Sequence, residues 1–112
     1  MGKYTPPEVT IRDVLAALPP LKLPLALVVA IRPAQGSPER AYVAVELVHY
    51  GKLGACTVYK RWGREVRASS TKDVMRALLI AAQDAYLYLD GRDSEELAEF
   101  VEWQLGVPKW NG

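Results

Sequence analysis

Apolar side chains alternate with polar or small ones along residues 40–50. Such a period of two is typical of a strand that turns one face toward a hydrophobic core. Residues 25–32 before this stretch and 55–62 after it are also rich in β-branched and aromatic residues. Short segments that contain glycine separate the three stretches and provide turns. The pattern therefore predicts three consecutive antiparallel strands in a meander.

Gly63 interrupts the pattern directly after the third predicted strand. A glycine inside a strand often marks a bulge. Residues 64–68 therefore form either a bulged continuation of that strand or a short fourth strand. We expect a sheet of three to four strands.

A short helix is predicted before the sheet. Thr10 and Asp13 form a T-x-x-D capping box at its start, and Pro19 and Pro20 end it. A start near Thr5 also fits the sequence.

Two more helices are predicted after the sheet. The first begins at Ser70 and closes at Gly91, and the second is capped by Asp93 or Ser94 and closes at Gly106. We therefore predict one α+β domain over residues 1–112. It consists of a short N-terminal helix, a three- to four-stranded antiparallel meander sheet and a C-terminal helical hairpin packed on one face.

The alternation also assigns the two faces of the sheet. If Arg32 lies opposite Arg40, the odd-numbered residues of the first two strands form the core face that the helices cover. The other face, here called the open face, has small apolar residues in its middle, tyrosines around them and arginines at its edge. In the register that the turn suggests, the third strand adds Thr57, Tyr59 and Arg61 to it. A register slipped by one residue adds Lys60, Trp62 and Arg64 instead.

Charge is unevenly distributed along the 112 residues. The net charge is only +1, but residues 1–83 carry +6 and residues 84–112 carry −5. The densest basic stretch, residues 60–76, can approach phosphate groups. On charge alone, an equally good interpretation is that its cations pair with the acidic C-terminal part.

Several classes of protein are excluded by counting. One cysteine and one histidine, Cys56 and His49, cannot make an internal disulfide or a zinc site of cysteines and histidines.

The longest apolar stretch is too interrupted for a membrane span, and no signal-peptide pattern is present, so we expect a cytoplasmic protein. Eight prolines and no asparagine before Asn111 suggest a heat-adapted source.

Candidate catalytic residues are few. We interpret His49, on the core-facing parity of its strand, as structural and Cys56 as a small buried hydrophobe. Glu46 has no second carboxylate at a predictable distance, so we expect it to accept hydrogen bonds or to pair with Arg61. The glycines form no nucleotide-binding motif, and the acidic residues lack the EF-hand order. We expect no catalytic residue, no metal and no cofactor; a small enzyme that uses Glu46 with a tyrosine is the weakest hypothesis.

Aromatic and basic residues together on the open face favour binding of single-stranded DNA or RNA with little sequence preference. Bases stack on aromatic rings, and cations neutralise the backbone. The predicted stacking residues are Tyr42, Tyr50, Tyr59 and Trp62. The predicted phosphate-binding residues are Lys60, Arg61, Arg64 and Arg67, and Arg32 with Arg40 extends the basic edge.

The main alternative is a protein-interaction or scaffold module that buries the same aromatic residues against another chain. Tyr, Trp and Arg are enriched at the centres of interfaces, and a net charge near zero suits such a role. Tyr86 and Tyr88 of the first C-terminal helix also remain available for a partner subunit. We expect a homodimer.

The order of elements, the stretch Thr57-Val58-Tyr59-Lys60-Arg61-Trp62-Gly63-Arg64 and the heat-adapted composition resemble the ThermoDBP family of archaeal single-stranded-DNA-binding proteins. The resemblance spans most of the chain. It implies a hydrophobic cleft with basic edges that holds bases inward, little sequence preference, and oligomers. Some family members carry a C-terminal leucine zipper, whereas this sequence ends with Val107-Pro108-Lys109-Trp110-Asn111-Gly112, so a dimer is expected to use the surface of the domain.

Overall fold

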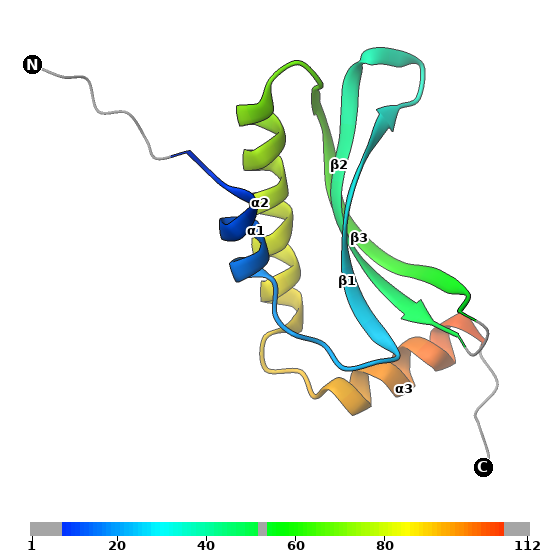
Figure 1. The fold of residues 1–112 in the computed structure, drawn as a ribbon. Coiled ribbons are helices and arrows are strands. Elements are labelled where there is room, and N and C mark those ends of the chain that lie inside the picture. The colour runs from blue at the N-terminus through cyan, green and yellow to red at the C-terminus, as the bar shows by residue number, and fades with distance from the viewer. Residues whose placement is uncertain (1–7, 52–53, 107–112) are drawn as a thin grey trace, which may run out of the picture.

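A computed structural model describes residues 8–51 and 54–106 and shows a three-stranded antiparallel sheet with one helix before it and two after it (Figure 1). The elements are α1 (Ile11–Ala17), β1 (Leu25–Ala34), β2 (Ser37–Tyr50), β3 (Cys56–Arg67), α2 (Thr71–Leu89) and α3 (Ser94–Leu105). The sheet order β1-β2-β3 is a meander, which confirms the predicted α+β fold. β3 continues through Gly63 to Arg67, so the predicted continuation of the third strand is observed, without a bulge at Gly63. The described residues form no separate fourth strand.

The capping box predicted for α1 is present. The Asp13 backbone N–H donates to Thr10 Oγ1 at 3.2 Å, and the Thr10 backbone N–H donates to Asp13 Oδ2 at 2.8 Å. This second bond favours the charged carboxylate and holds the pKa of Asp13 below its ordinary value. The alternative start near Thr5 lies outside the described residues.

The ends of α2 and α3 also follow the predicted caps. Ser70 Oγ accepts from the Asp73 backbone N–H at 3.2 Å, and Asp93 Oδ1 accepts from two backbone N–H groups of the first turn of α3. Gly106 closes α3 at φ +70°, in the left-handed region that glycine adopts without a steric penalty. These short-range signals place the helix ends correctly.

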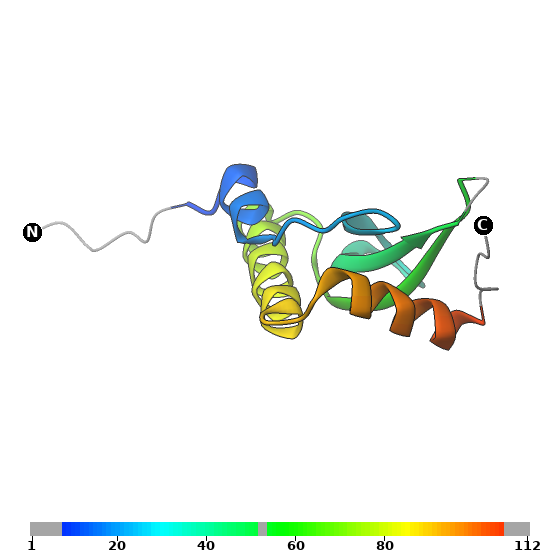
Figure 2. The same ribbon diagram turned by 90° about the horizontal axis from the view of Figure 1, so that it is seen from below.

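The helices pack on the face formed by the odd-numbered residues of β1 and β2, as predicted. One cluster joins α1 and α2 to Val43 and Val45. A second cluster joins α3 and the end of α2 to Leu25 and Leu47. α3 leads away from the end of α2 rather than folding back along it, so the two helices cover different ends of the sheet (Figures 1 and 2). In the part of the chain that the structure describes, no helix is long and apolar enough to cross a membrane.

The register between β1 and β2 differs from the predicted one. Arg32 lies opposite Tyr42, not opposite Arg40. The register changes between Pro33 and Ala34, because a tight turn at Gly36 pairs Ala34 with Ser37 and leaves residues 38–40 without a partner in β1. The shift is two residues, so every side chain stays on its predicted face although the predicted cross-strand pairs are wrong.

A second irregularity changes the parity of β3. Leu47 pairs with Lys60 but Val48 pairs with Val58, so Tyr59 is an extra residue in β3. This bulge allows both Tyr59 and Trp62 to pack on the helix side, where an unbroken strand could place only one of them. The prediction that Tyr59 and Thr57 lie on the open face is therefore wrong, and so is the alternative that places Lys60, Trp62 and Arg64 there.

Candidate nucleic-acid interface

The open face has a closed floor although no described helix packs on it. Ala44, Glu46 and Val48 of the central strand are 0, 5 and 1 % exposed, yet none of them belongs to the two helix-side clusters. Side chains of the neighbouring strands must therefore cover them. The residues of β1 on this face are small, namely Ala26, Val28 and Ala30, and they stay half-buried. Apart from Glu46, the middle of the open face is therefore formed by small or β-branched apolar residues.

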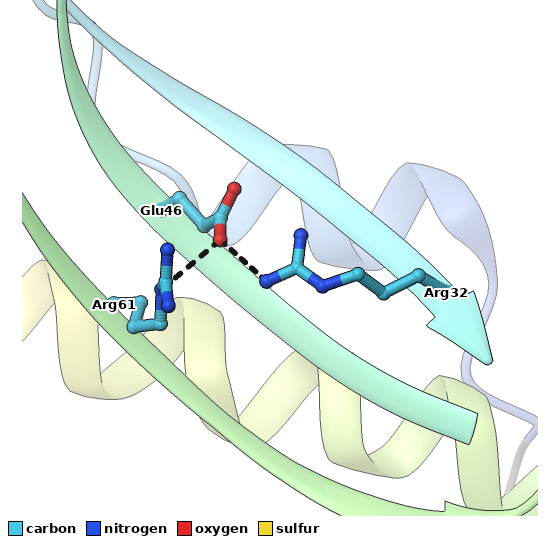
Figure 3. A network of polar contacts seen from close by, with 3 residues as sticks. All are labelled: Arg32, Glu46 and Arg61. Atoms are coloured by element: carbon cyan, nitrogen blue, oxygen red, sulfur yellow. Dashed lines mark hydrogen bonds and ion pairs between the residues drawn. The ribbon is translucent and has the colours of Figure 1, made fainter. Parts of the chain in front are cut away.

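Glu46 is the centre of the polar contacts on this face. Arg32 Nη2 donates to Glu46 Oε2 at 3.1 Å, and Arg61 Nε lies 3.2 Å from the same oxygen (Figure 3). The three side chains come from β1, β2 and β3, and the arginines approach the carboxylate from opposite sides. The Glu46 side chain is 7 % exposed, whereas those of Arg32 and Arg61 are 46 and 51 % exposed. This confirms the predicted pairing of Glu46 with Arg61 and adds Arg32.

Tyr42 extends this cluster toward β3. The Arg32 guanidinium lies 4.9 Å from the centre of its ring, a cation–π distance. The Tyr42 hydroxyl lies over Gly63, where an added Cβ would come within 2.7 Å of it. The missing side chain at Gly63 thus makes space for the tyrosine to lie across β3.

Arginines continue along the end of the sheet near the β1–β2 turn. Arg40 Nε lies 3.4 Å from Glu65 Oε2, and Arg67 is the partner of Arg40 in the sheet. Two adjoining hollows of about 410 and 670 Å³ lie here, and both are lined by Pro38, Arg40 and Ala68. The first is also lined by Arg32, but Ile31, Thr71 and Val74 place it mainly on the helix side, beside the start of α2. The second is also lined by Arg67 and lies at the basic end of the open face.

The helix side of β3 carries a second cluster, here called the ledge and formed by Tyr59, Lys60, Trp62, Tyr88 and Arg92. The rings of Trp62 and Tyr88 are 5.5 Å apart. Lys60 Nζ lies 5.7 Å from the first ring and 5.2 Å from the second, and the Arg92 guanidinium lies 4.3 Å from Tyr88. Arg92 lies just beyond the end of α2, where its Nε donates to the Tyr88 backbone oxygen at 2.6 Å.

Tyr59 of the ledge has a pKa raised above its ordinary value. Partial burial raises its pKa, and the hydroxyl of Tyr88 beside it acts in the same direction. Its ring packs edge-on against Phe100 of α3, which in turn lies 6.1 Å from Trp103. Phe100 and Trp103 are 45 and 73 % exposed. The ledge thus passes into an exposed aromatic surface on α3.

The ten predicted site residues divide between the two sides of the sheet. The open face or its basic end receives Arg32, Arg40, Tyr42, Tyr50, Arg61 and Arg67. The helix side of β3 receives Tyr59, Lys60, Trp62 and Arg64. The predicted site residues therefore form two surfaces, one on each side of the sheet.

The remaining candidates have simpler roles. His49 is buried, as predicted, and its Nε2 lies 3.3 Å from Glu102 Oε1. Cys56 is exposed, not buried as predicted, because it lies at the end of the edge strand β3. Over residues 8–51 and 54–106, no three His, Cys, Asp or Glu side chains are grouped closely enough to hold a metal ion.

The arginine ion pairs of the described residues are local to the sheet. Arg32 and Arg61 pair with Glu46, and Arg40 pairs with Glu65. Among the described residues, no lysine or arginine of the stretch 60–76 pairs with an acidic residue of the C-terminal part. The interpretation in which those two parts neutralise each other is therefore wrong for this region.

Comparison with known proteins does not identify the chain. No protein-family model matches it, and no match was found among curated proteins or among solved structures.

Proposed function

We propose that this protein binds single-stranded nucleic acid without catalysing a reaction, and that the open face holds the strand. The observation that carries the proposal is the Glu46 cluster. One carboxylate can neutralise only one of the two guanidiniums that contact it, so a positive charge remains on an otherwise apolar surface. Both arginines are half-exposed and can turn toward a phosphate.

The surroundings of this charge suit bases. The floor of small residues leaves room for flat rings, and a base can stack on the guanidinium plane of Arg32 or on the ring of Tyr42 below it. Tyr50, 38 % exposed at the far end of β2, offers a second ring. Such contacts depend little on base identity, because every base has an apolar face.

The open face also has a favourable charge. Its described charged residues are four arginines and two glutamates, at positions 32, 40, 61, 67 and 46, 65. The basic end extends this charge beyond the strands. The resemblance to the ThermoDBP family implies the same arrangement, a hydrophobic cleft with basic edges.

Adjacent residues of β3 provide the test. Arg61 lies on the open face and Lys60 on the ledge, both are exposed, and Arg61→Ala and Lys60→Ala remove one positive charge each. We would measure fluorescence anisotropy of a labelled mixed-sequence strand of about 20 nucleotides, with unlabelled duplex as competitor. We expect Arg61→Ala to weaken single-strand binding about tenfold, or about 1.4 kcal/mol, and Lys60→Ala to have little effect.

Each other outcome has a defined meaning. If Lys60→Ala weakens binding and Arg61→Ala does not, the strand lies on the ledge and the open face is not the site. If the unchanged protein binds no single strand even at low salt, or prefers duplex, the proposed function is wrong.

A protein-interaction module is the second candidate, and the surface of α3 favours it. Trp103 and Phe100 are exposed next to acidic residues of the same helix, Glu99 and Glu102. Large exposed aromatic side chains are typical of protein interfaces, whereas neighbouring carboxylates repel phosphates. Loss of a partner protein in Trp103→Ala, with single-strand binding unchanged, would assign this role to α3.

A further inference from the structure

β1 is one of the two edge strands, and among the described residues no further strand pairs with its free side. Its residues 25–31 include no charged residue and no proline. Among the residues that the structure describes, this segment makes only one backbone hydrogen bond outside its pairing with β2, from Leu25 N to Lys22 O. Natural edge strands are normally protected by charges, prolines, bulges or a covering element.

The other edge strand has the usual protection. β3 carries four positively charged side chains, Lys60, Arg61, Arg64 and Arg67, and it is bulged at Tyr59. Two copies of β3 side by side would bring these charges together. The two edges of the sheet therefore differ in kind, and only β1 can accept a second strand without a charge penalty.

The side chains of β1 are also incompletely covered. Residues 26–30 are half-buried and Ile31 is 55 % exposed, whereas most of residues 41–49 in the central strand are buried. A further strand beside β1 would cover this apolar surface and satisfy the free backbone groups together.

We propose that the partner is a second copy of this chain, which pairs antiparallel through its own β1 to form a two-fold symmetric dimer with a continuous six-stranded sheet. Residues 25–31 are self-complementary, since apolar residues meet apolar residues when the strand pairs with itself. With Val28 or Val29 at the two-fold axis, the Arg32 residues of the two copies are six to eight positions apart. At about 3.3 Å per residue, that separation is roughly 20–26 Å, too far for strong repulsion.

The symmetry decides how the two faces combine. A two-fold axis that relates neighbouring antiparallel strands is perpendicular to the sheet, so equivalent side chains of both copies point to the same side. The two open faces form one surface with two Glu46 clusters, and the helices of both copies lie on the opposite side. If the open face binds nucleic acid, as proposed above, one strand can cross both copies.

Sedimentation velocity of the full chain without nucleic acid tests the dimer. In the monomer, the new lysine of Val28→Lys lies opposite Glu46 and can pair with it. In the dimer, the two new lysines lie close together and repel each other. Val58→Lys is the matched control, because Val58 is a half-buried valine on the same face of the other edge strand. Circular dichroism checks that both variants fold.

We expect the unchanged chain and Val58→Lys to sediment at about twice 12.4 kDa. Val28→Lys should be monomeric, with a dissociation constant raised about 100-fold or more, and amides of residues 25–31 should exchange faster in it. A monomeric unchanged chain would overturn the proposal, as would a dimer that survives Val28→Lys or that Val58→Lys dissociates.

The consequence for binding is measured separately and rests on the proposed function. An oligonucleotide long enough to cross two open faces should bind with a stoichiometry of one per dimer of the unchanged chain. Because sedimentation needs no nucleic acid, a dimer that binds no strand refutes the proposed function alone. A monomer that binds a strand refutes the dimer alone.

Discussion

Gly63 controls the shape of the open face through the side chain it lacks. A Cβ at this position would lie 2.7 Å from both the Tyr42 hydroxyl and Ala44 Cβ, and 2.8 Å from the Val43 carbonyl oxygen. The backbone oxygen and the buried alanine cannot move aside as a flexible side-chain end can. The position of Tyr42, and of the arginine stacked on it, therefore depends on this glycine.

We predict that Gly63→Ala lowers the free energy of unfolding by about 1–3 kcal/mol, as overpacking does elsewhere. Urea denaturation measures it. Gly51→Ala is the control, because its added Cβ would meet nothing closer than 3.5 Å. Equal stability of the two variants would contradict the close approach of Tyr42 to β3.

Glu46 is expected to act on stability and binding in opposite directions. Glu46→Gln removes the buried charge that holds Arg32 and Arg61, so the free energy of unfolding should fall by about 1–3 kcal/mol. The same change frees both guanidiniums, so affinity for a single strand should rise. Glu65→Gln, whose partner Arg40 is exposed, should cost less than about 1 kcal/mol. A variant that loses both stability and affinity would show that Glu46 positions the arginines for the ligand.

At the scale of elements, helix starts and strand irregularities have different origins. The cap of α1 is made by residues three positions apart, so it forms wherever that sequence becomes helical. The bulge in β3 has no local signal of glycine or proline, and it exists because both Tyr59 and Trp62 find cover from α2 and α3.

The cap of α1 should make stability depend on pH. The pKa of Asp13 is lower in the folded chain than its usual value of about 3.9 because its carboxylate accepts the Thr10 N–H. Its contribution is therefore complete above the unfolded pKa and disappears as the pH falls through the folded pKa. We expect Asp13→Asn to be less stable than the unchanged protein at neutral pH, and the difference to become smaller at an acid pH below the ordinary pKa of a carboxyl group.

Urea denaturation at the two pH values measures this difference. Asp73→Asn is the control. Asp73 occupies the matching position of α2, but there the cap is made by the side chain of Ser70 and not by the carboxylate. A difference for Asp13→Asn that persists in acid would show that the amide substitution acts through packing and not through charge.

At the scale of the whole molecule, the acidic residues are concentrated on one helix. α3 carries four glutamates on the helix side, whereas the open face carries four arginines and two glutamates. The proposed binding of a single strand to the open face therefore avoids the acidic helix, although the net charge is only +1.

Salt dependence should separate phosphate contacts from stacking. We predict that Arg61→Ala reduces the slope of log affinity against log salt by about 0.7, the value for one phosphate of a single strand. Tyr50→Ala should weaken binding by about 1–3 kcal/mol and leave that slope unchanged. Anisotropy titrations at several salt concentrations measure both, and equal slopes in all three proteins would exclude a phosphate contact at Arg61.

The sequence by itself determined the features that depend on neighbouring residues. Caps, helix ends, the three strands and the two faces of β1 and β2 follow from spacings of two to four residues. The pairing of Glu46 with Arg61 also followed, because both positions were assigned to the same face.

Only the tertiary structure decided the pairing of distant segments. The extra residue Tyr59 and the place of Lys60 and Trp62 beside Tyr88 depend on which side chains the helices can cover. The two-residue shift between β1 and β2 depends on the turn at Gly36 that joins them. Alternation permits several registers that differ little in local energy, and long-range packing selects one of them. For that reason the residue types of the site could be read from the chain, but their division between two surfaces could not.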